Sequence, residues 1–150
     1  MNKRSIGWPR QFFALLLMIV LPVAASFAHA EGLPPKDEKQ ILRVVRSQLD
    51  AFAHGDAAKA FSYAAPNIRR QVGTAEQFME MVRTQYEVVY RPASATFLRP
   101  SGQAGEAVLH VQLTDEDGDL WTAVYTLQKQ KNKSWRITGC ALSPNAVTMV

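Results

Sequence analysis

The chain has 150 residues, with 17 lysines and arginines against 13 aspartates and glutamates, and a formal net charge of +4. Three basic residues, Lys3, Arg4 and Arg10, lie in the first thirty positions, which hold no acidic residue, so the remainder carries 14 minus 13, or +1. This length predicts one domain after those thirty positions, and a near-neutral domain argues against a nucleic-acid partner.

The first thirty residues have the pattern of a cleavable secretory signal. A basic start precedes the unbroken apolar run Phe12 to Leu21, and Ala28-His29-Ala30 provides a small-x-small cleavage site. The run is shorter than the roughly 20 residues of a spanning helix. The first residue after the cut would be Glu31, and the one cysteine, Cys140, is far away, so no lipid anchor is expected. We predict a signal peptide over 1–30, cleavage between Ala30 and Glu31, and a secreted, periplasmic product without a stable membrane anchor.

Residues 31–36 hold Gly32, Pro34 and Pro35 and are predicted to form a flexible lead-in to a single α+β domain over 37–150. The first helix is predicted to begin at Asp37, where Gln40 would complete a capping box. Apolar residues at three- and four-residue spacing continue the helix as far as Gly55.

Two further helices and one helical turn are predicted before the first strand. Asp56 caps a short helix, and Pro66 opens the helical turn, which continues through Arg70. Thr74 and Gln77 form a second capping box, which starts a helix that ends near residue 85 or 86.

After Arg91-Pro92 the apolar period changes from helical to alternating, which is typical of strands. Strands are predicted over 95–98, 107–114, 121–127 and 135–142, and residues 100–105 are predicted as a loop. Asp117-Gly118 indicates a hairpin turn, and Lys129, Lys131 and Lys133 are predicted in an exposed turn. Helices followed by a meander predict three helices on one face of a curved antiparallel sheet of about four strands. The other face would be solvated or paired with a second chain.

Several stretches resemble a known family. They are Gln48 to Phe52, Ala60 to Pro66, Tyr90 to Pro92, Leu113 to Trp121 and Ser134 to Cys140. In order and spacing they resemble the bacterial domain of unknown function 4864, within the nuclear transport factor 2-like superfamily. The resemblance covers roughly residues 39 to 143. It implies a cone-shaped α+β fold that encloses a pocket. It implies no activity, because the family itself has no assigned one. Some members of the wider superfamily are acid–base enzymes and others are binding or dimerisation modules, and fold analogy does not choose between them.

No motif predicts a metal, a cofactor or a nucleophile. The acidic run 115–119 lacks the spacing of a calcium loop. Asp50 and His110 are the candidate general bases. The alternative for Asp50 is an exposed ion pair, and the alternative for His110 is a position on the outer sheet face. Cys140 is expected to be buried. The candidate pocket residues are aromatic: Tyr63, Tyr86, Tyr90, Trp121 and Tyr125.

Two functions remain open on the sequence. The first is a secreted, non-catalytic domain that binds a small apolar ligand in the pocket or a second copy through the open sheet face. The alternative is a lyase, isomerase or hydrolase of the ketosteroid isomerase type, with Asp50 or His110 as the base and a tyrosine as hydrogen-bond donor.

Overall fold

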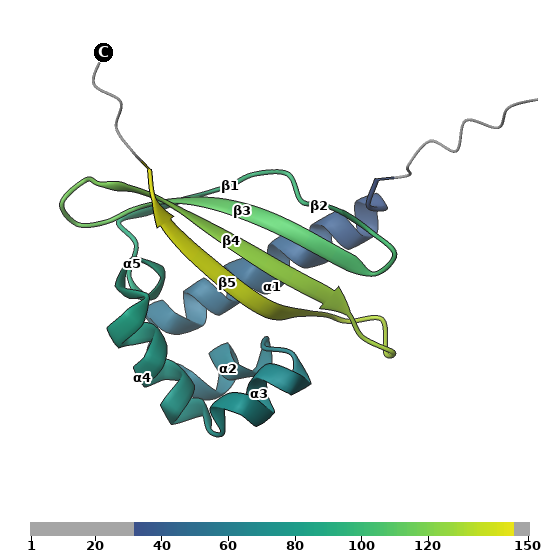
Figure 1. The fold of residues 1–150 in the computed structure, drawn as a ribbon, viewed down its shortest axis with the longest axis horizontal. Coiled ribbons are helices and arrows are strands. Elements are labelled where there is room, and N and C mark those ends of the chain that lie inside the picture. Colours follow the sequence, from purple (N-terminus) through teal and green to yellow (C-terminus); the bar gives the residue numbers. More distant parts are fainter. Residues whose placement is uncertain (1–31, 146–150) are drawn as a thin grey trace, which may run out of the picture.

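The computed structural model describes residues 32–145 (Figure 1), so the predicted signal peptide and its cleavage point at Ala30 and Glu31 lie outside the described residues. Within 32–145 the helices are α1 (Pro35–Ala53), α2 (Ala57–Ser62), α3 (Pro66–Val72), α4 (Ala75–Gln85) and α5 (Glu87–Tyr90). The strands are β1 (Ser94–Phe97), β2 (Ser101–Gln103), β3 (Glu106–Thr114), β4 (Leu120–Lys129) and β5 (Trp135–Pro144). The predicted α+β order is confirmed.

Helix α1 begins at Pro35, inside the predicted lead-in, and its start differs from the prediction. The preceding Pro34 makes no side-chain cap, and proline suits the first helical position because it has no N–H to satisfy. The carboxylate of Asp37 accepts hydrogen bonds from Lys129 Nζ and Trp135 Nε1 instead of capping the helix. The predicted capping box at Asp37 is therefore wrong, and so is the placement of Lys129 in an exposed turn.

The later helix starts agree with the sequence. Asp56 accepts a hydrogen bond from the Lys59 N–H at the start of α2. Thr74 and Gln77 form the reciprocal capping box at the start of α4, which ends at Gln85. The short helix α5 was not predicted, because four residues are too few to show a helical period.

The sheet is antiparallel, in the order β1-β3-β4-β5, with β2 pairing beside β1 on the same edge of β3. It has five strands, where the sequence predicts about four, because residues 101–103 of the predicted loop 100–105 pair with β3 as β2. Alternate side chains of the two central strands are fully buried against the helices: Ala107, Leu109, Val111, Leu113, Ala123, Tyr125 and Leu127. The predicted inner face is confirmed.

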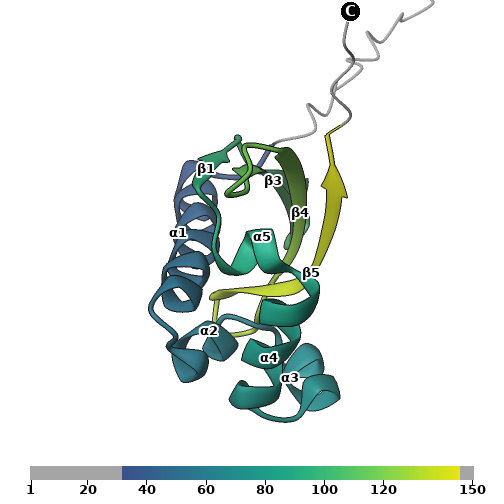
Figure 2. The same ribbon diagram turned by 90° about the vertical axis from the view of Figure 1, so that its left-hand side faces the viewer.

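The helices lie on one side of the curved sheet (Figure 2). Helix α1 runs along its inner face, and α2, α3 and α4 gather at one end (Figures 1 and 2). Strand β5 bends at a bulge, since Thr126 pairs with Gly139 but Leu127 pairs with Ile137, which leaves Thr138 as the extra residue. Among residues 32–145, no helix is both long and apolar enough to cross a bilayer.

Candidate functional site

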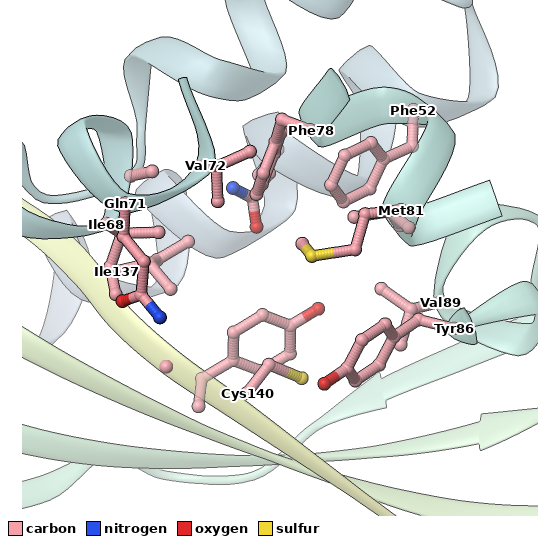
Figure 3. Close-up of a pocket in the computed structure, with 15 residues that line it drawn as sticks. Phe52, Ile68, Gln71, Val72, Phe78, Met81, Tyr86, Val89, Ile137 and Cys140 are labelled. Carbon is pink, nitrogen blue, oxygen red and sulfur yellow. The ribbon is translucent and has the colours of Figure 1, made fainter. Parts of the chain in front are cut away.

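A cavity of about 260 Å³ lies between the sheet and the helices at the bent end of β5 (Figure 3). Fifteen residues line it: Gln48, Phe52, Ala64, Ile68, Gln71, Val72, Phe78, Met81, Val82, Tyr86, Val89, Tyr125, Ile137, Gly139 and Cys140. The lining contains no aspartate, glutamate, lysine, arginine or histidine. A concave, apolar wall with a few polar atoms is the usual form of a small-molecule site.

Local structure explains why these segments meet. The backbone of β5 pairs with the segment that follows α2, because Ala65 N–H donates to the Ile137 carbonyl over 2.8 Å and Ile137 N–H donates to the Tyr63 carbonyl over 2.9 Å. The segment then turns at Pro66 into α3, which carries Ile68 and Val72 to the rim. The cavity is the space that remains where β5 bends towards α3 and α4.

Two sheet residues form the part of the wall opposite α4. Tyr125 and Cys140 are directly paired on β4 and β5, so their side chains lie on the same inner face. Burial raises the pKa of the Cys140 thiol to about 11 and raises the pKa of Tyr125 well above its ordinary value. Both groups therefore stay protonated near neutral pH. Cys140 is half-buried, in partial agreement with the expected burial.

The two candidate bases lie away from this cavity. Asp50 is on the exposed side of α1, with 58% of its side chain accessible, and its Oδ1 lies 3.4 Å from His54 Nδ1. His110 is exposed on the face of β3 that points away from the helices. Neither residue is in the cavity wall, so the geometry does not favour a mechanism in which either acts as base there.

The five aromatic candidates divide among different places. Tyr86 and Tyr125 line the cavity. Tyr90 and Trp121 line a second hollow, which also contains Arg91 and Asp115, and the Trp121 Nε1 donates to Asp115 Oδ2 over 2.8 Å. Tyr63 lies at the end of α2, and its side chain lines neither of these hollows.

Several residues of the cavity wall were not singled out from the sequence. Most of them are apolar residues of a kind that sequence patterns assign to packing: Ile68, Val72, Met81 and Val89. Nothing in their spacing separates the wall of a cavity from the core. The remaining α3 residue of the wall, Gln71, is polar and exposed. In the part of the chain that the structure describes, no three His, Cys, Asp or Glu side chains are grouped so as to hold a metal ion.

Comparison with known families now adds to the geometry. Residues 34–150 match the family described as domain of unknown function (DUF4864). The chain belongs to this family. The DUF4864 match spans every residue of the cavity wall. A comparison with curated proteins finds no match for this DUF4864 chain.

Solved structures show which fold this DUF4864 protein has. An NTF-2 like protein of unknown function from Silicibacter pomeroyi DSS-3 is similar, with a TM-score of 0.50, 16% identity, and coverage of 73% of this chain and 97% of that chain. Another NTF2-like protein of unknown function, from Shewanella baltica OS155, has a TM-score of 0.49 and 12% identity, with 73% and 94% covered. The DUF4864 chain has an NTF2-like fold, as its sequence resemblance implied.

Proposed function

We propose that this protein is a secreted binding domain that holds a small apolar molecule in the cavity between the sheet, α3 and α4 without converting it. The observation that carries the proposal is the composition of the wall, which is apolar and aromatic and has no carboxylate, imidazole or amine. General acid–base catalysis needs a group that gains and loses a proton near the working pH. The two titratable groups beside each other in the wall, Tyr125 and Cys140, stay protonated there because burial raises the pKa of both.

The binding proposal is tested by titrating the protein with naphthalene and following backbone amide resonances by NMR. We expect the shifts to concentrate on α3, α4 and the bent part of β5. The substitution Val72→Trp adds a ring at the rim and should weaken binding by about tenfold or more, because the ring occupies the volume of the ligand.

The matched control is Val44→Trp, the same exchange at a half-buried valine of α1 that does not line the cavity. It should leave the affinity for naphthalene unchanged. Shifts confined to the outer sheet face, or equal weakening by both substitutions, would count against a ligand in the cavity.

We further propose that residues 1–30 direct export to the periplasm and are removed there. The basic start, the short apolar run and the Ala28-His29-Ala30 site support this. N-terminal sequencing of the protein from the periplasmic fraction of a bacterial host should begin at Glu31. The substitution Ala30→Asp should leave the precursor uncleaved, because the cleavage site requires a small residue. A product that retains Met1 in the wild type would refute the proposal.

The outer sheet face supports a second proposal, that two copies of the chain pair through it. The central part of this outer face consists of ten side chains: Thr96, Leu98, Val108, His110, Gln112, Thr122, Val124, Thr126, Ala141 and Ser143. None of these ten is an aspartate, glutamate, lysine or arginine, and the charged residues Glu106 and Arg136 lie on the same face at its edge, where β3 and β5 begin. Leu98 is 43% exposed beside His110. A central patch without fixed charges can meet its own copy across a two-fold axis without like-charge repulsion.

A further inference from the structure

The hydroxyl of Tyr125 is a buried polar group that lacks a hydrogen-bond partner. Tyr125 lies in the middle of β4, paired with Leu109 on β3 and Cys140 on β5, and is only 1% exposed. Within residues 32–145, no group has hydrogen-bond geometry to its hydroxyl oxygen. The paired Cys140 thiol interacts with the hydroxyl and, in addition to burial, raises the pKa of Tyr125, but a thiol is only a weak donor and acceptor. Buried hydroxyl groups in folded proteins are nearly always bonded, so this one requires an explanation.

The surroundings of Tyr125 connect this unpartnered hydroxyl with the cavity. Tyr125 is part of the cavity wall, together with aliphatic and aromatic residues from α1, α4 and α5. The amide nitrogen of Gln48, also in the wall, already donates to the Ala60 carbonyl over 3.1 Å. The Tyr125 hydroxyl is therefore the fully buried donor that an occupant of the cavity would find free.

The same wall restricts the charge of the occupant. No cationic side chain lines the cavity, so a carboxylate or phosphate would lose its hydration without gaining a counter-charge. Burial keeps the Tyr125 hydroxyl protonated, which leaves it as a donor near neutral pH. An apolar wall with one fully buried hydroxyl donor left unpaired fits a molecule with an apolar body and one uncharged acceptor.

We propose that Tyr125 donates a hydrogen bond to an uncharged oxygen, such as a carbonyl, on an otherwise apolar ligand held in the cavity. This inference rests on the proposed binding function and adds the chemical class of the ligand. Tyr125 then has two roles: its ring packs in the core, and its hydroxyl orients the ligand and selects for it. The Tyr125 hydroxyl thereby gains the hydrogen-bond partner that the protein itself does not provide.

The experiment compares two molecules of nearly equal shape, 2-acetylnaphthalene and 2-isopropenylnaphthalene, which differ in having a carbonyl oxygen or a methylene group. Their affinities are measured for the wild type and for Tyr125→Phe, which removes only the hydroxyl. We expect Tyr125→Phe to lower the affinity for the ketone by about five- to tenfold, which corresponds to the loss of one neutral hydrogen bond. The affinity for the alkene should change by less than about twofold, since the alkene makes no such bond.

A second readout does not depend on affinity. The infrared carbonyl stretch of the bound ketone should lie at lower frequency in the wild type than in Tyr125→Phe, because a hydrogen bond weakens the C=O bond. The matched control is Tyr63→Phe, which removes the hydroxyl of a half-buried tyrosine that does not line the cavity. In this variant, the ratio of the ketone affinity to the alkene affinity and the carbonyl frequency of the bound ketone should both be the same as in the wild type.

The outcomes separate this inference from the binding proposal. If Tyr125→Phe weakens the binding of both molecules equally or of neither, or if Tyr63→Phe alone weakens the binding of the ketone, the assignment to Tyr125 is overturned while binding in the cavity stands. If neither molecule binds the folded wild type, both the assignment and the binding proposal are overturned. Thermal denaturation of each variant establishes that it is folded.

Discussion

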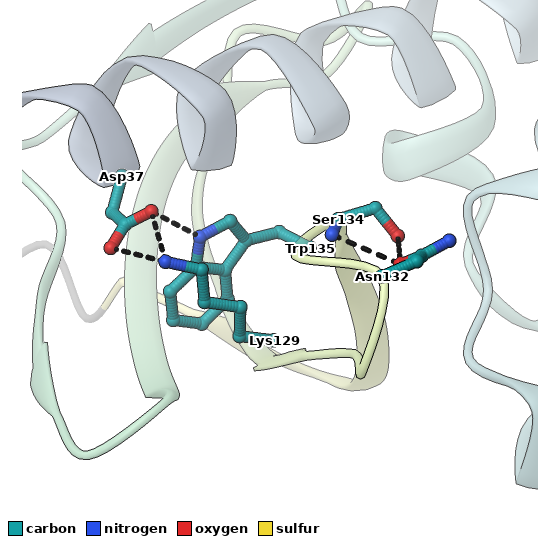
Figure 4. Close-up of polar contacts among 5 residues, drawn as sticks. All are labelled: Asp37, Lys129, Asn132, Ser134 and Trp135. Carbon is teal, nitrogen blue, oxygen red and sulfur yellow. Dashed lines mark hydrogen bonds and ion pairs between the residues drawn. The ribbon is translucent and has the colours of Figure 1, made fainter.

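At the scale of single residues, Asp37 connects distant parts of the chain (Figure 4). Its carboxylate oxygens both lie 2.9 Å from Lys129 Nζ, and one lies 3.1 Å from Trp135 Nε1. Lys129 and Trp135 are directly paired at the ends of β4 and β5. The first turn of α1 is thereby fixed to the end of the sheet. The hydrogen bonds from Lys129 and Trp135 lower the pKa of Asp37.

We expect Asp37→Asn to lower the free energy of unfolding by about 2 kcal/mol at pH 7, because a charge-assisted bond is lost and Lys129 keeps a half-buried charge without its partner. The stabilisation by Asp37 is present above its unfolded-state pKa, near 3.8, and is lost as the pH falls through the lower folded-state pKa. Urea denaturation at several pH values should therefore show wild type and variant converging in acid.

The control for this ion pair is Glu38→Gln, which removes the neighbouring pair with Arg99. The Arg99 side chain is 81% exposed, so Glu38→Gln should lower the free energy of unfolding much less than Asp37→Asn does. If the Asp37→Asn difference stayed constant down to pH 2, the ionised carboxylate would not be its source.

The thiol of Cys140 provides a second residue-scale prediction. Burial raises its pKa to about 11, so very little thiolate exists at pH 8. We expect a thiol reagent to label the native protein at least about 100-fold more slowly than the urea-unfolded protein, in which an ordinary cysteine pKa applies. Stopped-time labelling followed by mass spectrometry measures both rates. Rapid labelling of the native protein would contradict this prediction, because it would show that the Cys140 thiol is accessible to the reagent and ionised.

At the scale of elements, the stability of α4 depends on the capping box at its start. Thr74 Oγ1 accepts from the Gln77 N–H over 3.2 Å, and Gln77 Oε1 accepts from the Thr74 N–H over 3.1 Å. This helix carries Phe78, Met81 and Val82 into the cavity wall. The capping box therefore stabilises the helix that forms part of the cavity wall, although neither Thr74 nor Gln77 lines the cavity.

We expect Thr74→Ala to lower the free energy of unfolding by about 1 kcal/mol, because it leaves an N-terminal amide of α4 without an acceptor. Urea denaturation measures the loss. The matched control is Thr84→Ala near the other end of the helix, where the threonine hydroxyl bonds back to the Glu80 carbonyl. Its change should be within about 0.5 kcal/mol. Equal losses in the two variants would indicate that threonine contributes through packing and not through the cap.

The differences between expected and observed elements have local causes. The caps at Asp56 and Thr74 were predictable because they act within three residues of the chain. Asp37 was misplaced because a partner 92 residues away competes for the same carboxylate. Strand β2 was missed because it has three residues and one partner strand, and Gly102 adopts φ +153 where an added Cβ would lie 2.1 Å from the Glu106 carbonyl oxygen.

At the scale of the whole molecule, the proposed pairing of outer faces can be tested by light scattering at micromolar concentration. We expect the wild type to scatter as a dimer. Val124 is opposite His110 in the centre of the outer face, so Val124→Lys would place like charges together at the two-fold interface and should give a monomer. The control Ala58→Lys adds the same charge on the exposed side of α2 and should stay dimeric. A monomeric wild type would refute the pairing.

Periodicity and capping chemistry in the sequence determined the helices, the strand alternation and the inner face of β3 and β4, because these depend on residues close together in the chain. Tertiary structure decided which side chains share the cavity. Tyr86 and Tyr125 meet there because β5 bends at its bulge and pairs with the segment after α2, whereas Asp50 and His110 face outward on α1 and β3. A cavity is the volume that packing leaves between distant segments, and no local pattern encodes that volume.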